Sequence, residues 1–108
     1  MQLGIVEYID CAHHLPGHPK CGPMHGHTYK VEIMIEGDKS GGMVLDFAEL
    51  KATTREVLAR YDHHDWNDFL EFPTVENICE LLAGQLRERL RFPLRIRVWE
   101  GHGKWAET

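Results

Sequence analysis

Two alternating runs that carry histidines at their joined ends constrain the fold of this chain most strongly. In Leu3–His13 and again in His25–Ile35, most apolar side chains and the histidines occupy odd positions. A period of two is typical of β-strands, because successive side chains point to opposite faces of a sheet. A stretch rich in Pro and Gly, residues 16–23, separates the two runs. We therefore expect two strands with His13, His25 and His27 on the core side, close to the loop that joins them.

The middle of the chain changes to helical spacing. One amphipathic helix is expected after Asp46, with apolar positions at Phe47, Leu50, Val57, Leu58 and Tyr61. A second helix is expected after Pro73, with Thr74 as N-cap and a stripe at Val75, Ile78, Leu82, Leu86 and Leu90. Residues 94–100 alternate again, and glycines at 101 and 103 flank a turn into a short last strand. This order, ββααββ, predicts an α+β fold: a four-stranded antiparallel sheet with two helices on one face.

Length and composition narrow the class of protein. At 108 residues we expect a single domain spanning 1–108. The net charge is −5, and the only concentration of basic residues, at 87–97, reads as a solvated face, so no nucleic-acid partner is expected. The sequence has no recognisable targeting segment and no long apolar span, which predicts a cytoplasmic protein without a membrane contact. Three cysteines without paired spacing, Cys11, Cys21 and Cys79, indicate reduced thiols.

The histidines predict a metal site. Two histidines one residue apart on a strand can bind one ion together, and His13 adds a third imidazole. Neutral imidazole is a common zinc ligand, and three protein ligands with an open position are typical of catalytic zinc. A structural zinc site closes all four positions instead. Spacing alone leaves open whether Cys21 is that fourth ligand.

A set of motifs spread along nearly the whole chain resembles one family. The motifs are Ala12-His13-His14-Leu15, Cys21-Gly22-x-x-His25-Gly26-His27, Val44-Leu45-Asp46-Phe47, Asp62-His63-His64 with Asn67, Pro73-Thr74-x-Glu76-Asn77, and Glu100. Together they resemble the 6-pyruvoyltetrahydropterin synthase and 6-carboxytetrahydropterin synthase family. The short gap between Cys21 and the histidine pair is closer to the carboxytetrahydropterin branch. The resemblance implies the tunnelling fold, or T-fold, in which such sheets associate into a barrel and two trimers stack into a hexamer.

The resemblance also implies a role for each motif residue. The implied zinc ligands are His13, His25 and His27. Cys21 would serve as general base, helped by a nearby cation that favours the thiolate, and Asp62 with His63 would complete the proton relay. Glu100 would anchor the pterin ring, with help from backbone groups around Thr74. Without the resemblance, Asp62-His63 would read as a polar helix-ending turn and Glu100 as a solvated carboxylate.

The activity implied is that of a zinc-dependent lyase with a pterin substrate. It would convert 7,8-dihydroneopterin triphosphate to 6-carboxytetrahydropterin with release of acetaldehyde and triphosphate, and so feed synthesis of 7-deazaguanines such as queuosine. Two alternatives remain: 6-pyruvoyltetrahydropterin synthase activity, which eliminates triphosphate, and a non-catalytic zinc-stabilised module that binds a pterin or purine. His14 stands where the family often has an arginine, which raises the question of how many phosphates the substrate carries.

Overall fold

The computed structural model describes residues 1–108 and contains four strands and two α-helices. In chain order these are β1 (Gln2–His13), β2 (His25–Glu36), α1 (Phe47–Leu58), α2 (Val75–Arg89), β3 (Leu94–Glu100) and β4 (Lys104–Glu107). A short 3₁₀ turn, Trp66–Asp68, lies between the two helices. The predicted α+β fold with order ββααββ is confirmed. Neither helix combines the length and the apolar character that crossing a membrane requires.

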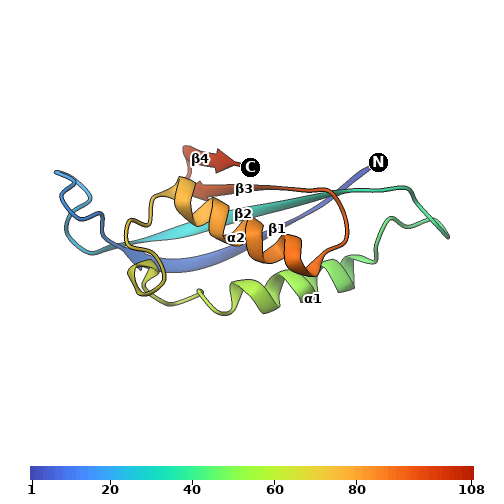
Figure 1. Ribbon diagram of the computed structural model, residues 1–108, viewed down its shortest axis with the longest axis horizontal. Helices are drawn as coiled ribbons and strands as arrows, with labels where there is room; N and C mark the ends of the chain where they lie inside the picture. Colours follow the sequence, from blue (N-terminus) through green and yellow to red (C-terminus); the bar gives the residue numbers. More distant parts are fainter.

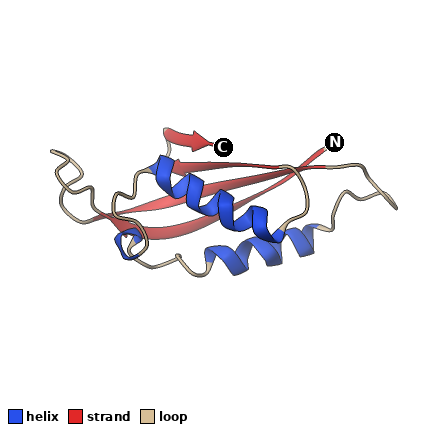
Figure 2. Ribbon diagram, viewed as in Figure 1, coloured by secondary structure: helices blue, strands red, loops and turns tan.

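The strands form one antiparallel sheet in the order β1-β2-β3-β4. β1 and β2 build a long hairpin whose pairing runs from Gln2↔Glu36 to His13↔His25. This hairpin helps to make the molecule elongated, with a longest extent of 52 Å. Both helices cover the same face of the sheet (Figures 1 and 2). The opposite face carries no helix and is called the outer face below.

The core lies between the sheet and the helices. It includes alternate residues of β2 and β3 and one stripe of each helix, among them Val31, Ile33, Ile96, Val98, Leu50, Val57, Leu58, Ile78, Leu82 and Leu86. The odd positions of β2 thus face the helices, as the alternation predicts. Phe47 was predicted to belong to the apolar stripe of α1, but it lies in the first turn of that helix and is 55% exposed.

Both predicted N-caps are present. The Asp46 carboxylate accepts a hydrogen bond from Ala48 N at 2.8 Å, and the Thr74 hydroxyl accepts one from Asn77 N at 3.1 Å. Such a side chain satisfies a backbone N–H that the first turn leaves without a partner, and it contributes about 1 kcal/mol. The cap at Thr74 fixes where α2 begins and therefore where the preceding residue, Pro73, lies.

Several contacts gather the loops at one end of the β1–β2 hairpin. The Asn67 side chain accepts from His14 N at 2.9 Å and donates to His14 O at 3.0 Å. Asp65 forms an isolated parallel bridge with Ala12, next to the last residue of β1. The segment between the helices is therefore held against the end of the sheet that carries the histidines.

Candidate metal and substrate site

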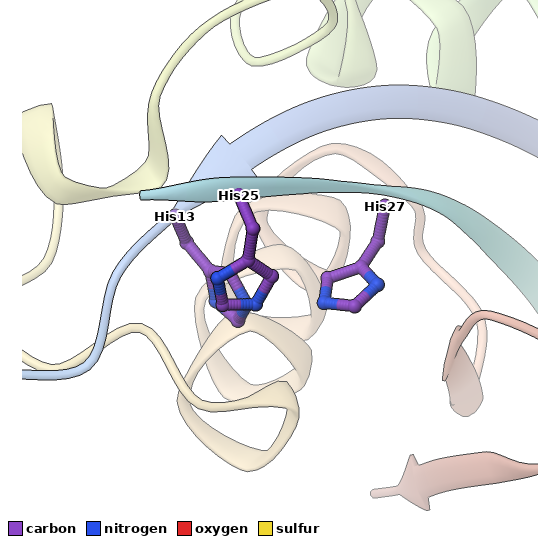
Figure 3. Close-up of side chains that lie close together, drawn as sticks. All are labelled: His13, His25 and His27. Atoms are coloured by element: carbon purple, nitrogen blue, oxygen red, sulfur yellow. The ribbon is translucent and has the colours of Figure 1, made fainter. Parts of the chain in front are cut away.

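Three histidine side chains meet at the end of the hairpin (Figure 3). His13 is the last residue of β1, and His25 and His27 lie at the start of β2. The cross-strand pairs are His13 with His25 and Cys11 with His27, which places all three imidazoles on the helix-covered face. One ring nitrogen from each lies within 4.8 Å of the others, close enough to hold one metal ion.

Backbone carbonyls fix the orientation of two of these rings. His13 Nδ1 lies 2.8 Å from Pro73 O, and His25 Nδ1 lies 2.8 Å from Pro23 O. A carbonyl oxygen only accepts, so both Nδ1 atoms carry the proton and both Nε2 atoms are lone pairs in the neutral rings. Those two Nε2 atoms are 3.0 Å apart. Two lone pairs this close repel each other unless a cation lies between them, and the N–N separation at tetrahedral zinc is about 3.3 Å.

The third ring has a free nitrogen. His27 Nε2 is buried without a hydrogen-bond partner and stands 3.5 Å from Glu100 Oε1, beyond normal hydrogen-bonding length. Burial lowers the pKa of His27, an effect that the Glu100 carboxylate only partly offsets. A metal requires the neutral form of its imidazole ligands. The three side chains therefore offer a metal ion three imidazole nitrogens gathered within 4.8 Å of one another.

Cys21 and His18 lie outside this group. In the loop before β2, Cys21 O accepts from Leu15 N at 2.7 Å, and the Cys21 thiol does not join the three imidazoles as a close ligand set. His18 Nδ1 accepts from the backbone N–H groups of Lys20 and Cys21, which makes it a loop-forming residue. This arrangement favours three imidazole ligands over the closed site with Cys21 as fourth ligand.

The two predicted substrate residues lie beside the histidines. Glu100 ends β3 opposite Tyr29 and shares the helix-covered face with His27, as its parity in the sequence predicts. Thr74 follows the residue whose carbonyl holds His13, but its own hydroxyl is occupied as the cap of α2. The side chain of Thr74 is therefore structural here, and only its backbone and neighbours remain for a ligand.

Asp62 and His63 form a pair at a different place, along the edge of β1 that does not pair with β2. His63 Nδ1 lies 2.9 Å from Asp62 Oδ1, and the His63 side chain is 77% exposed. The backbone of His63 has a φ of 63°, a conformation that costs a non-glycine residue on the order of 1 kcal/mol. Its N–H donates to Asp10 O at 2.7 Å, which holds the residue in that conformation.

Sequence reasoning missed the residues that support this pair. Asp10 has the parity opposite to the core residues of β1, and its carboxylate lies with Asp62 and His63 in a second group of possible ligands. Arg55 of α1 reaches the pair through a hydrogen bond to Asp62 Oδ2 at 3.3 Å. No motif marks either residue: Asp10 meets Asp62 from 52 positions away, and Arg55 reaches Asp62 only because the chain turns back after α1.

Within one chain the predicted residues thus fall into two groups. The three histidines and Glu100 lie on the helix-covered face, whereas Asp62 and His63 lie against Asp10 beside the outer face. Cys21 contacts neither Asp62 nor His63 through any hydrogen bond of the structure. The three residues predicted to form the proton relay are not assembled in a single chain.

Comparison with known proteins decides the family. The family model described as 6-pyruvoyl tetrahydropterin synthase matches residues 2–108. The chain belongs to the 6-pyruvoyl tetrahydropterin synthase family. The resemblance inferred from the motifs is confirmed, and it covers nearly all of the chain.

Relatives within the family carry different names. A protein of Archaeoglobus fulgidus, provisionally named 6-carboxy-5,6,7,8-tetrahydropterin synthase, is 46% identical over 108 residues, which cover 99% of this chain and 94% of that protein. A protein of Pyrococcus furiosus named dihydroneopterin monophosphate aldolase is 33% identical over 82 residues, covering 73% of this chain and 72% of that protein. The relatives are pterin enzymes, and their names differ in the reaction and in the phosphate state of the substrate.

The fold matches solved structures of the same family. The 6-pyruvoyl tetrahydropterin synthase of Caenorhabditis elegans superposes with a TM-score of 0.89 at 22% identity, covering all of this chain and 94% of that one. At this identity the match establishes the fold alone. It confirms the predicted T-fold.

Proposed function

We propose that this member of the family is a zinc-dependent 6-carboxytetrahydropterin synthase. It would convert 7,8-dihydroneopterin triphosphate and one water molecule to 6-carboxytetrahydropterin, acetaldehyde and triphosphate. The observation that carries the proposal is the trio of imidazoles whose ring nitrogens converge, two of them fixed by backbone carbonyls. The short spacing from Cys21 to the histidine pair and the 46% identity to the Archaeoglobus fulgidus protein support the carboxytetrahydropterin branch.

In this proposal His13, His25 and His27 hold the zinc ion and leave its fourth position for oxygen atoms of the pterin side chain. Bound zinc supplies Lewis-acid chemistry, which stabilises negative charge on a substrate oxygen. Glu100 stands 3.5 Å from His27 and offers two acceptor oxygens to the amino group and ring N–H of a pterin. Ring and side chain of the substrate would then bind side by side on one face of the sheet.

Proton transfer is assigned to Cys21, Asp62 and His63. Because Asp62 and His63 lie along the β1 edge, away from the imidazoles of their own chain, we propose that a second copy of the chain completes each site, within a hexamer built from two trimers. Mixing a Cys21→Ala variant with a His63→Ala variant tests this. Reassembled mixtures should regain part of the activity that each variant lacks, whereas inactive mixtures that do exchange subunits would contradict a shared site.

Two other reactions remain as alternatives within the same site. One is 6-pyruvoyltetrahydropterin synthase activity, in which triphosphate is eliminated and the carbon skeleton stays whole. The other is the aldolase reaction on dihydroneopterin monophosphate named for the Pyrococcus furiosus relative. The non-enzymatic alternative is a module that binds a pterin without catalysis.

The deciding experiment is mass spectrometry of the products formed by zinc-loaded protein, with acetaldehyde assayed in the same tube. Dihydroneopterin triphosphate and dihydroneopterin monophosphate are supplied separately. Carboxytetrahydropterin with one equivalent of acetaldehyde supports the proposal. Pyruvoyltetrahydropterin, or turnover of the monophosphate alone, moves the chain to one of the other reactions, and binding without turnover supports the module.

A further inference from the structure

Arg55 joins three parts of the molecule that the proposed function does not itself connect. From α1 its guanidinium donates to Tyr8 O of β1 at 3.2 Å and to Asp62 Oδ2 at 3.3 Å. We propose that Arg55 is a positioning residue, which holds Asp62 so that His63 keeps its proton on Nδ1 and presents Nε2 for proton transfer. The inference rests on the proposed acid–base role of Asp62 and His63.

The contacts of Asp62 use both of its oxygen atoms. Oδ1 accepts from Asp10 N at 3.0 Å and lies 2.9 Å from His63 Nδ1, while Oδ2 accepts from Arg55 at 3.3 Å. The first two contacts share one oxygen, so they alone do not fix the plane of the carboxylate. The guanidinium supplies the contact at the second oxygen and anchors itself on the backbone of β1. The carboxylate can then turn only by breaking a contact at each end.

Asp62 is ionised, so its carboxylate can accept hydrogen bonds but cannot donate one. Partial burial alone would raise the pKa of its carboxyl group, but the Asp10 N–H and the charges of His63 and Arg55 outweigh that effect and lower it. An ionised carboxylate can only accept, so its closeness to His63 Nδ1 favours the tautomer that carries the proton on Nδ1. A neutral imidazole has one N–H, which leaves the lone pair on Nε2. This is the atom that can take up a proton from outside the chain.

The chain contains a matched control for this contact. Arg89 of α2 forms an ion pair with Glu56 at 3.0 Å, and its side chain is 37% exposed, close to the 36% of Arg55. Each arginine thus extends from a helix, pairs with one carboxylate, and is exposed to a similar extent. Arg89 has no contact with Asp62 or His63, so an Arg89→Ala change removes the same charge without touching the pair.

The first measurement is the tautomer of His63, read from long-range ¹H–¹⁵N spectra at about pH 8.5, where imidazoles are neutral. The native chain and Arg89→Ala should hold the proton on Nδ1. Arg55→Ala should shift the population towards the Nε2-protonated form, as should Asp62→Asn. An Arg55→Ala spectrum identical to the native one overturns the proposal, whatever the chain catalyses. If Arg55→Ala does not fold, Arg55→Lys replaces it, because lysine keeps the positive charge but lacks the two guanidinium nitrogens that donate to Tyr8 O and Asp62 Oδ2.

The second measurement is a double-mutant cycle on kcat with the substrate that the product assay identifies. Loss of a group that orients a functional histidine is expected to lower kcat about 10-fold, with KM unchanged and partial recovery in Arg55→Lys. In an Asp62→Asn background, Arg55→Ala should have no further effect. Equal losses in both backgrounds would overturn the positioning role. Wild-type protein that turns over no pterin would contradict the proposed function, while the tautomer result still decides the inference about Arg55.

Discussion

The histidine triad and the Asp62–His63 pair are two functional regions built in opposite ways. The triad comes from two paired strands, so alternation alone brings His13, His25 and His27 to one face. The pair lies in the segment between the helices and depends on Asp10, 52 positions away in the chain, and on Arg55 of the preceding helix. The triad is partly enclosed beneath the helices, whereas His63 is 77% exposed. Metal ligands must point in fixed directions, which a paired strand provides. A proton-transfer group that serves a neighbouring copy of the chain must instead be exposed on the surface.

The largest effect is expected at the triad. A His27→Ala change should abolish tight metal binding and lower activity by more than about 100-fold, since loss of even an outer partner of a metal ligand costs about 10–100-fold. The sheet should stay folded, because His27 lies at the end of the hairpin and outside the core cluster. Metal analysis, circular dichroism and turnover measure the three effects. His18→Ala is the control, and equal metal loss in that variant would break the distinction between ligand and loop histidines.

At the pair we expect a loss of turnover alone, without the loss of metal that His27→Ala causes. His63→Ala should lower kcat by about 100- to 10,000-fold, the usual contribution of a general acid or base, while the metal content stays at the native level. His64→Ala serves as its neighbour control, because His64 Nδ1 bonds only to the Asp62 carbonyl. If His63→Ala lost metal as well, the two regions would not be separate.

Substrate anchoring should be affected at Glu100. A Glu100→Gln change keeps the shape but exchanges an acceptor oxygen for a donor, and hydrogen bonds to a charged group contribute about 1.5–3 kcal/mol. KM should rise about 10-fold or more, with the metal retained. Glu107→Gln on β4, which pairs with Arg97 away from the triad, is the control. An unchanged KM would remove Glu100 from the substrate site.

The smallest effect is a pH-dependent change in stability at Asp62. The Asp10 N–H and the charges of His63 and Arg55 hold the pKa of Asp62 in the folded chain below its ordinary value, so its contribution to stability is fully present above that ordinary value and disappears as pH falls through the folded pKa. Asp62→Asn should therefore be less stable than the native chain at pH 7, by about 1 kcal/mol. The difference should vanish under strongly acidic conditions. Urea unfolding at several pH values measures it, and a difference that stays constant with pH would contradict the assigned contacts.

The fold could be predicted from sequence because its signals are local. Alternation marked the strands, helical spacing marked α1 and α2, and Asp46 and Thr74 marked two helix starts that the structure confirms. Phe47 has the right spacing but is 55% exposed. Periodicity identifies which face of a helix is apolar, but it does not show whether the sheet reaches far enough to cover the first turn. The same alternation placed Glu100 on the apolar face of its strand, where the structure shows it 3.5 Å from His27.

The support of the site could not be predicted in this way. The carbonyls of Pro23 and Pro73 orient two of the imidazoles, yet a carbonyl is present at every residue and carries no sequence signal. Asp10 and Arg55 act through contacts that only the folded chain creates. Motif resemblance named Asp62 and His63, but the structure was needed to place them along the edge of β1 that does not pair with β2.

The most direct test of the account is X-ray absorption at the zinc edge of the zinc-loaded protein. Three imidazole nitrogens with an open position predict a first shell of nitrogen and oxygen atoms at about 2.0–2.1 Å and no sulfur. Adding the substrate should change that shell at the oxygen position. A sulfur atom at about 2.3 Å would identify Cys21 as a fourth ligand. That result would replace the open catalytic site with a closed structural one.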